Sequence, residues 1–165
     1  MCTAISYKAK DFYFGRTLDY ESSYGEEVVI TPRHYQFSYA HMGECTTHYA
    51  MIGMAHVAEE YPLYYEAVNE KGLGMAGLNF VGNACYGEYE ENAKNVATYE
   101  FIPWVLGACE SVEQVRDSLI GLNLIGETFA GKYPPWRWWK KVCVFMTTRL
   151  GYLPTIRLLT SRCFC

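Results

Sequence analysis

The sequence lacks long apolar runs. No uninterrupted apolar segment approaches the roughly 18 residues that a membrane-spanning helix requires. The first residues also lack the basic stretch and apolar core of a signal peptide. We therefore expect a cytoplasmic protein without a membrane span. Its seven cysteines are odd in number and widely spread, which favours reduced thiols over disulfides.

Acidic residues are missing from the C-terminal part of the chain. All 18 Asp and Glu residues lie at or before Glu127, and from Lys132 onward there are seven basic residues and no acidic one. Residues 1–131 hold the other seven basic residues, so the two parts carry opposite net charge although the whole chain is at −4. The overall charge gives no indication of nucleic-acid binding, but the abrupt change near residue 131 requires an explanation.

The sequence offers little that would bind a metal or a cofactor. Its four histidines show no close ligand pairing, and we interpret them as solvated or core residues: His34, His41, His48 and His56. Residues Gly126–Lys132 have the spacing of a phosphate-binding loop, but Tyr133 stands where a serine or threonine would hold magnesium. We therefore predict neither a metal site nor a cofactor.

Residue patterns predict a single α+β domain. A chain of 165 residues can bury a real core, and half of its residues are hydrophobic. β-Branched and aromatic residues predict antiparallel strands at 2–8, 12–20, 27–31, 48–55, 65–69 and 75–80. Helical spacing follows over Ala97–Ala108, where Pro103 predicts a break or kink, and again from Val112 to about residue 122. Ser111 and Gln114 have the spacing of a capping box at the start of the second helix.

Cys2 is the sharpest candidate for a catalytic residue. Removal of Met1 before this small residue would place a thiol and a free α-amine on one residue. An α-amine has a pKa of about 8 and can take the thiol proton at physiological pH, so nucleophile and base come together. Position alone is weak support, because a cysteine can follow the start methionine by chance.

Two charged residues on the next predicted strand favour the catalytic interpretation. A hairpin turn at residues 9–11 would bring Arg16 and Asp19 back beside Cys2. A cation there favours the thiolate, and a carboxylate could orient the α-ammonium group. The alternative interpretation is an ordinary surface ion pair between Arg16 and Asp19, which contributes about 0–1 kcal/mol.

Three blocks of the sequence resemble one known family. They are Met1–Thr3, Phe14–Asp19 and Asn69–Phe80, the last of which reads Asn-Glu-Lys-Gly-Leu-Gly-Met-Ala-Gly-Leu-Asn-Phe. In this order and spacing they are similar to the choloylglycine hydrolase family, which contains bile salt hydrolases and penicillin V acylases. The resemblance runs from Met1 to about Ile125. It implies an N-terminal-nucleophile hydrolase with an αββα sandwich, here incomplete because the family's proteins are longer.

The resemblance also implies a set of site residues. By position, Cys2 is the nucleophile, Arg16 and Asp19 are its immediate partners, and Asn79 is a donor in the oxyanion hole. A side-chain amide aimed at the developing oxyanion lowers an acyl-transfer barrier by roughly 3–4 kcal/mol. The implied reaction is hydrolysis of a linear amide without a cofactor.

The substrate class implied by the resemblance leaves alternatives open. Bile salt hydrolases resemble this chain in having asparagine at position 79, which favours glycine- or taurine-conjugated bile acids as the small-molecule substrate. Penicillin V acylases, which often have tyrosine there, are the alternative, and an inactive truncated fragment is a third interpretation. A homo-oligomer is compatible with the resemblance. Tyr61, Tyr64 and Tyr65 could line an apolar substrate pocket, although such residues more commonly pack in a core.

Residues 132–165 depart from the family pattern. Codons can be chosen for Trp138–Phe164 so that a second reading frame encodes a string that resembles the family's next block, including the Asn-Asn-Pro that supplies a second oxyanion asparagine. We therefore interpret residues 1–131 as the N-terminal part of a linear-amide hydrolase domain and residues 132–165 as an aberrant basic tail produced by a frameshift. A genuine tail that binds an acidic partner is a weaker alternative, because its Trp and Cys residues follow no amphipathic period.

Overall fold

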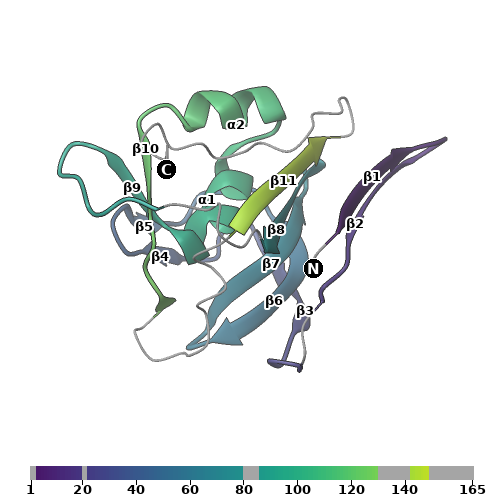
Figure 1. Cartoon of the computed structure of the whole chain (residues 1–165), viewed down its shortest axis with the longest axis horizontal. Helices are drawn as coiled ribbons and strands as arrows, with labels where there is room; N and C mark the ends of the chain where they lie inside the picture. Colours follow the sequence, from purple (N-terminus) through teal and green to yellow (C-terminus); the bar gives the residue numbers. More distant parts are fainter. Residues whose placement is uncertain (1–2, 20–21, 80–85, 130–141, 149–165) are drawn as a thin grey trace.

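A five-stranded antiparallel sheet forms the centre of the protein. The computed structural model describes residues 3–19, 22–79, 86–129 and 142–148, whose arrangement is drawn in Figure 1. The strand order in the sheet is β11-β8-β7-β6-β3. These strands are β3 (Glu27–Thr31), β6 (Met51–Ala58), β7 (Tyr61–Asn69), β8 (Leu73–Asn79) and β11 (Val142–Thr148).

Smaller strand pairs and two helices surround this sheet in the described part of the chain. The antiparallel hairpins are β1 (Ala4–Lys8) with β2 (Phe12–Arg16) and β4 (Phe37–Tyr39) with β5 (Gly43–Cys45). The pair of β9 (Lys94–Ala97) and β10 (Leu122–Ile125) is parallel. The helices are α1 (Phe101–Ala108) and α2 (Val112–Ser118), and a 3-10 turn (Thr98–Glu100) leads into α1. Neither helix is long and apolar enough to cross a bilayer.

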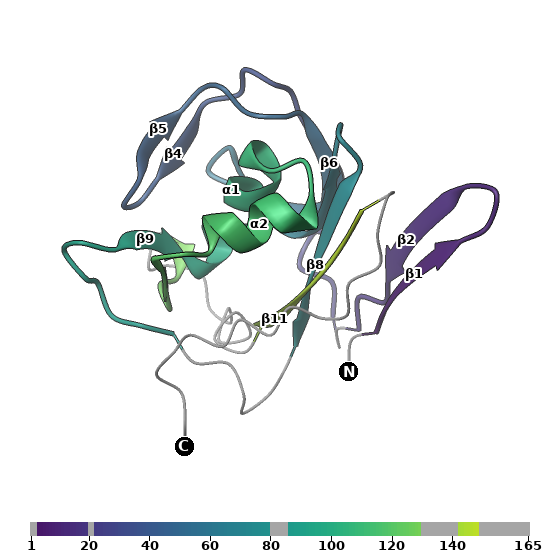
Figure 2. The same cartoon turned by 90° about the horizontal axis from the view of Figure 1, so that it is seen from above.

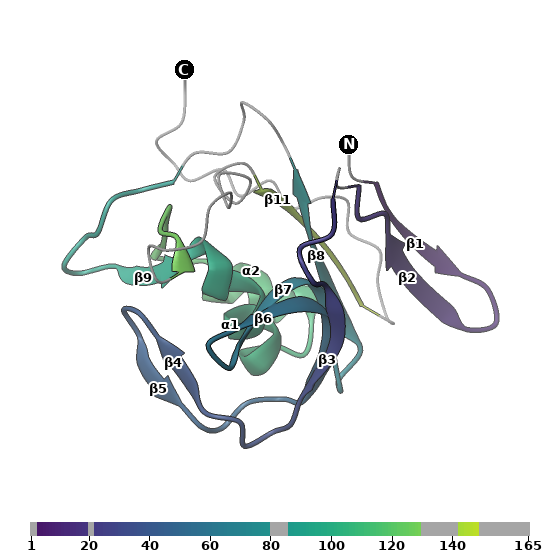
Figure 3. The same cartoon turned by 90° about the horizontal axis from the view of Figure 1, so that it is seen from below.

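The two faces of the central sheet carry different coverings. Both helices lie on one side, which we call the inner face, and the β1–β2 hairpin lies on the other side, the outer face (Figures 2 and 3). Helix α1 packs against β7 and β8. Leu73 and Met75 of β8 and Leu106 of α1 are fully buried between them. Burial of each such side chain contributes about 1.5–3 kcal/mol.

A β-bulge between β6 and β7 decides which side chains reach each face. The register runs from Met54 opposite Glu66 to Ala55 opposite Tyr64, so Tyr65 is the extra residue. Tyr64 therefore faces inward with Ala55, whereas Glu66 faces outward with Met54. By this register, the outer face is formed by the side chains of Val28, Ile30, Ile52, Met54, Glu66, Val68 and Ala76, together with the backbone of Gly74.

The predicted strands are present, with several shifted ends. Residues 27–31 form β3 as predicted, and the turn at 9–11 closes the β1–β2 hairpin. Strand β2 ends at Arg16 rather than at residue 20, β6 lies three residues further along the chain than the predicted 48–55, and β7 starts at Tyr61 rather than at residue 65. The sequence patterns did not predict β4, β5, β9 or β10, which have only three or four residues each.

The helix predictions need three corrections. Helix α1 begins at Phe101 rather than at the predicted Ala97, which belongs to β9. Pro103 is its third residue, where a backbone N–H has no intrahelical acceptor, so the helix runs through it without the predicted break. Helix α2 ends at Ser118 rather than near residue 122, because the chain turns there into β10. The predicted cap is confirmed, since the Ser111 side chain accepts a hydrogen bond from the Gln114 backbone N–H.

Candidate active site

The N-terminal hairpin brings a predicted site residue onto the outer face. Backbone hydrogen bonds extend the β1–β2 pairing to Thr3 and Thr17, where the Thr17 N–H donates to the Thr3 carbonyl at 2.8 Å. Phe14 packs over Gly74, since a Cβ built on that glycine would lie only 3.2 Å from the Phe14 ring. The hairpin is therefore anchored over β8, and its last strand residue, Arg16, points into the sheet.

Arg16 is a buried cation with defined partners. Its side chain is only 3% exposed. The Nε atom lies 3.2 Å from Oε2 of Glu66 on β7, and Nη2 donates a hydrogen bond to the carbonyl oxygen of Gly77 on β8. Nε and Nη1 are both buried without a hydrogen-bond partner among the described residues, so Nε meets Glu66 as an ion pair alone and Nη1 has neither kind of contact there. A buried donor without a partner costs about 1–3 kcal/mol, which marks this position as one where function can outweigh stability.

Glu66 sets the electrostatic balance at this point. Its side chain is 21% exposed, and burial raises the pKa of the carboxyl while the Arg16 guanidinium lowers it. The net direction is upward, because burial is the larger effect. Glu66 was not among the sequence-predicted residues. The signal that could have revealed it is a lone carboxylate inside the otherwise apolar and aromatic run of β7.

The other predicted site residues lie around this ion pair to different degrees. The exposed Asp19 follows β2, and its carboxylate accepts a hydrogen bond from the Thr17 hydroxyl at 3.1 Å. Asn79 is the last residue of β8, two positions after Gly77, and only its backbone is described. Cys2 lies outside the described residues. The fold thus brings the Arg16 side chain of β2 against β8, the strand that ends at Asn79. The catalytic roles assigned to Cys2, Arg16, Asp19 and Asn79 remain predictions.

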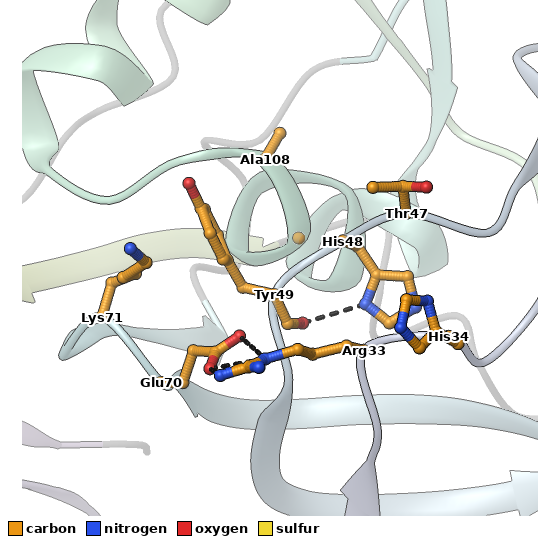
Figure 4. A pocket seen from close by; sticks show the side chains of 9 residues that line it. Arg33, His34, Thr47, His48, Tyr49, Glu70, Lys71 and Ala108 are labelled. Atoms are coloured by element: carbon orange, nitrogen blue, oxygen red, sulfur yellow. Dashed lines mark hydrogen bonds and ion pairs between the residues drawn. The ribbon is translucent and has the colours of Figure 1, made fainter.

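A separate polar pocket lies at the other end of β7 and β8. It has a volume of about 660 Å³ and is drawn in Figure 4. Its lining residues are Arg33, His34, Thr47, His48, Tyr49, Glu70, Lys71, Gly107 and Ala108. The Arg33 guanidinium forms a forked ion pair with Glu70, and Lys71 pairs with Glu110 at 2.9 Å. The cations and carboxylates here neutralise one another, so this pocket holds the β7–β8 turn against α1 and offers no excess charge.

The ion pairs of this pocket shift the pKa of their carboxyl groups. The hydrogen bond from Arg33 lowers the pKa of Glu70 to about 2, helped by the Ala50 N–H. The pKa of Glu110 is lowered by hydrogen bonds from the Tyr49 hydroxyl and Lys71. Both carboxylates therefore stay ionised well into the acid range.

Histidines and tyrosines singled out in the sequence lie mainly in structural positions. His48 is buried, and its ring nitrogens lie 2.9 and 2.8 Å from the carbonyl oxygens of Tyr49 and Tyr35. Within the described residues, no group of three or more His, Cys, Asp or Glu side chains is placed to hold a metal ion. The aromatic residues considered for a substrate pocket are all core residues: Tyr61, Tyr64 and Tyr65.

Solved structures assign the fold class of this chain. A mutant of conjugated bile acid hydrolase from Clostridium perfringens matches 92% of this chain and 46% of that chain, with a TM-score of 0.82 and 31% sequence identity. Penicillin V acylase from Agrobacterium tumefaciens matches 90% of this chain with a TM-score of 0.66 and 13% identity, which is a likeness of fold alone. The protein therefore has the α+β fold of the N-terminal-nucleophile hydrolases, and it is incomplete relative to both of these chains.

Sequence comparison then identifies the family. The family described as linear amide C–N hydrolases, choloylglycine hydrolase family, matches residues 2–138, and this chain belongs to it. The chain is 46% identical over 140 residues to a bile salt hydrolase/transferase from Lactiplantibacillus plantarum. It is 39% identical over 136 residues to a conjugated bile acid hydrolase from Lactobacillus gasseri. These matches cover 84% and 81% of this chain but 43% of each relative, so the chain spans less than half of their length. The resemblance predicted from the three sequence blocks is confirmed.

Proposed function

We propose that this chain is the N-terminal part of an enzyme that hydrolyses linear amides, with glycine- or taurine-conjugated bile acids as its substrates. Family membership over residues 2–138 supports the reaction class. The relatives named as bile salt or conjugated bile acid hydrolases support the substrate class. The structural observation that carries the proposal is Arg16, a cation held at 3% exposure on the strand that pairs with the N-terminal residues.

Each predicted site residue has a task in the proposed reaction. The Cys2 thiol gives its proton to its own α-amine, and Sγ attacks the amide carbonyl. Asn79 donates a hydrogen bond to the oxyanion, while Arg16 favours the thiolate and Asp19 orients the α-ammonium group. The α-ammonium passes the proton to the departing amine of glycine or taurine. Water then hydrolyses the thioester, which releases the bile acid and restores the thiol.

A substrate comparison tests the bile-acid assignment. The assay uses a full-length, in-frame version of this enzyme with glycocholate and with phenoxymethylpenicillin. We expect kcat/KM to be higher for glycocholate. Penicillin V acylase activity is the second candidate, because the family contains enzymes of both kinds. Much faster turnover of phenoxymethylpenicillin would replace the first assignment by the second.

The nucleophile is tested by mass spectrometry and one substitution. Intact-mass measurement is expected to show loss of Met1. In the in-frame version, Cys2→Ser is expected to lose nearly all turnover, because an α-amine with a pKa of about 8 deprotonates a serine hydroxyl poorly. An active enzyme that retains Met1, or a serine variant with full activity, would contradict the mechanism.

Residues 1–165 alone are proposed to have little hydrolase activity, since they span less than half of the relatives. The resemblance implies a second oxyanion asparagine beyond the matched region, and loss of one such donor costs on the order of 10²–10³ in rate. Assaying this chain beside the in-frame version on glycocholate tests the idea. Equal specific activity in the two would refute the fragment interpretation.

We also propose that a frameshift produced the tail, that the division lies at residue 131 and that the protein is cytoplasmic. The family match ends at residue 138, which supports a change of character in this region. Strand β11 lies within the proposed tail and pairs with β8, so part of the tail has a place in the sheet. The nucleotide sequence around codons 125–140 tests the frameshift: an insertion or deletion there is expected, and an unbroken frame would remove it.

A further inference from the structure

The Arg16 guanidinium is fixed from two neighbouring strands of the sheet. Glu66 on β7 and Ala76 on β8 are paired residues, so Gly77 is the next residue along β8. The carboxylate holds Nε of Arg16 and the Gly77 carbonyl accepts from Nη2. A free arginine side chain samples many rotamers, and two such contacts remove most of this freedom.

This arrangement leaves one edge of the guanidinium available. Nη1 is buried and has no hydrogen-bond partner among the described residues. Nη2 donates to the Gly77 carbonyl, and Nε lies at ion-pair distance from the Glu66 carboxylate without a hydrogen bond. The hairpin and the residues that follow it carry Lys8, Lys10, Asp11, Arg16 and Asp19, and β7 carries Glu66, while the β8 residues 73–78 carry no ionisable side chain. Among the described residues, the carboxylate that an ion-pair distance connects to the guanidinium is that of Glu66.

We propose that Glu66 is the positioning residue of this site, and that its carboxylate fixes the Arg16 guanidinium so that Arg16 can favour the Cys2 thiolate. This inference rests on the proposed function, since that function assigns the effect of Arg16 on Cys2. Glu66 touches neither substrate nor reacting atoms, and it acts through Arg16. Its position on β7 also fixes Arg16 relative to the end of β8, where Asn79 lies.

A simple effect of charge predicts the opposite result from positioning. If Glu66 acted only as a negative charge, then Glu66→Gln would make the site more positive and lower the pKa of the Cys2 thiol. If Glu66 positions Arg16, the same substitution frees the guanidinium, weakens its contact with the thiolate and raises that pKa. If Glu66 only tethers the hairpin to the sheet, Glu66→Gln would change stability and leave the pKa of the Cys2 thiol unchanged. The sign of the change therefore distinguishes the three roles.

The test follows alkylation of Cys2 by iodoacetamide across a range of pH, on the chain of residues 1–165 after loss of Met1. Mass spectrometry of the N-terminal peptide reports Cys2, and the half-buried free thiol of Cys45 on β5 serves as an internal control in every sample. The variants are Glu66→Gln, Glu66→Asp, Arg16→Gln and the double variant. Amide circular dichroism checks that each remains folded.

We expect Glu66→Gln to move the midpoint of Cys2 alkylation upward, toward the value of about 8.5 for a free thiol. Each unit of that shift lowers the rate about tenfold at pH values well below the midpoint. Glu66→Asp should keep the wild-type midpoint, because it retains a carboxylate. The double variant should have the same Cys2 midpoint as Arg16→Gln, because Glu66 acts on the thiol only through Arg16. Cys45 should react alike in all variants.

The outcomes separate this inference from the proposed function. The wild-type midpoint could be lowered, and Arg16→Gln could raise it while Glu66→Gln does not. That result would overturn the role of Glu66 and leave the role of Arg16 intact. If the wild-type midpoint equals that of a Cys-Thr-Ala-Ile peptide, neither Arg16 nor Glu66 has the proposed role. If Glu66→Gln fails to fold, NMR of the Arg16 Nε–H in wild type and Glu66→Asp decides: solvent protection in both supports positioning, and its absence in wild type refutes it.

Discussion

The two faces of the central sheet carry similar residue types but have different coverings. Inner-face residues such as Ala55 and Met75 are fully buried under the helix layer. On the outer face, Val28 and Ile30 of β3 remain 65% and 69% exposed, and only the β7–β8 side is covered by the hairpin that carries Arg16. Stability is therefore concentrated on one face, while the candidate chemistry lies at the covered edge of the other. This chain matches 46% of the solved bile acid hydrolase, and an exposed apolar surface of this kind is typical of a face that other residues cover.

The difference in burial between the two faces predicts the largest effect on the free energy of unfolding. Ile102→Ala in α1 removes a side chain that is 1% exposed and is expected to cost about 2–5 kcal/mol of unfolding free energy, through lost burial and the cavity that remains. The matched control Ile30→Ala makes the same chemical change on the outer face, where about 1 kcal/mol or less is expected. Urea denaturation of both variants measures the difference. Equal losses would mean that the outer face is covered in solution.

The covered part of the outer face should behave differently from its exposed part. Arg16→Gln is expected to cost about 1–3 kcal/mol at neutral pH, because it leaves the Glu66 carboxylate buried without its cation. Burial already raises the pKa of Glu66, and loss of Arg16 raises it further. A carboxyl group with a raised pKa in the folded state costs stability as pH rises through that pKa, so the loss should grow from acid toward neutral pH. Urea denaturation at several pH values checks this.

The control for that experiment is the double variant Arg16→Gln, Glu66→Gln. It has no ionisable group at this point, so its stability relative to wild type should not worsen between weakly acidic and neutral pH as that of the single variant does. A single variant whose loss is the same at every pH would show that Glu66 is well hydrated when Arg16 is absent.

Exposure of the outer face also predicts association of residues 1–165. Ile30→Lys is expected to weaken self-association about fivefold, which corresponds to about 1 kcal/mol, because it places a charge within the apolar surface. Sedimentation velocity over a range of concentrations measures the change. Ile120→Lys is the matched control, since Ile120 is 72% exposed but lies after α2, away from the outer face. A similar effect of both substitutions would point to net charge as the cause.

The smallest effect is expected at the polar pocket. Arg33→Gln removes the guanidinium that lowers the pKa of Glu70 to about 2, so that pKa should rise toward its ordinary value of 4.5. A carboxyl with a lowered pKa contributes stability at neutral pH that is lost as pH falls toward 2. Wild type should therefore resist mild acid slightly better than the variant, with no difference below that pH. NMR titration of the Glu70 carboxyl measures the shift, and Arg116→Gln on α2 should leave it unchanged.

Local patterns in the sequence predicted the elements whose signals lie within a few consecutive residues. The β-branched run at 27–31 and the Ser111 cap depend on neighbouring residues, and both were found as predicted. Strand β10 was not predicted, and its first residue was placed at the end of a helix, because the pairing with β9 joins residues far apart in the chain. Tertiary pairing of this kind leaves no local period to detect.

The candidate site was predictable to a similar extent. Arg16 was identified from its motif, and the structure places it at a buried position on β2. Glu66 was missed because the bulge at Tyr65 changes the alternation of β7, so that simple counting along the strand does not reveal which face a residue occupies. The roles of Cys2, Asp19 and Asn79 remain predictions.

The hydrogen bond between Arg16 and the Gly77 carbonyl spans 61 residues of sequence and has a consequence for the order of folding. At a translation speed of about 5–20 residues per second, Arg16 leaves the site of synthesis roughly 3–12 s before the carbonyl that it binds. The β1–β2 hairpin can close early, because its contacts are local, but its arginine stays hydrated until β7 and β8 exist to receive it. The N-terminal hairpin is therefore made first, and Arg16 reaches its partners Glu66 and Gly77 only once β7 and β8 have formed.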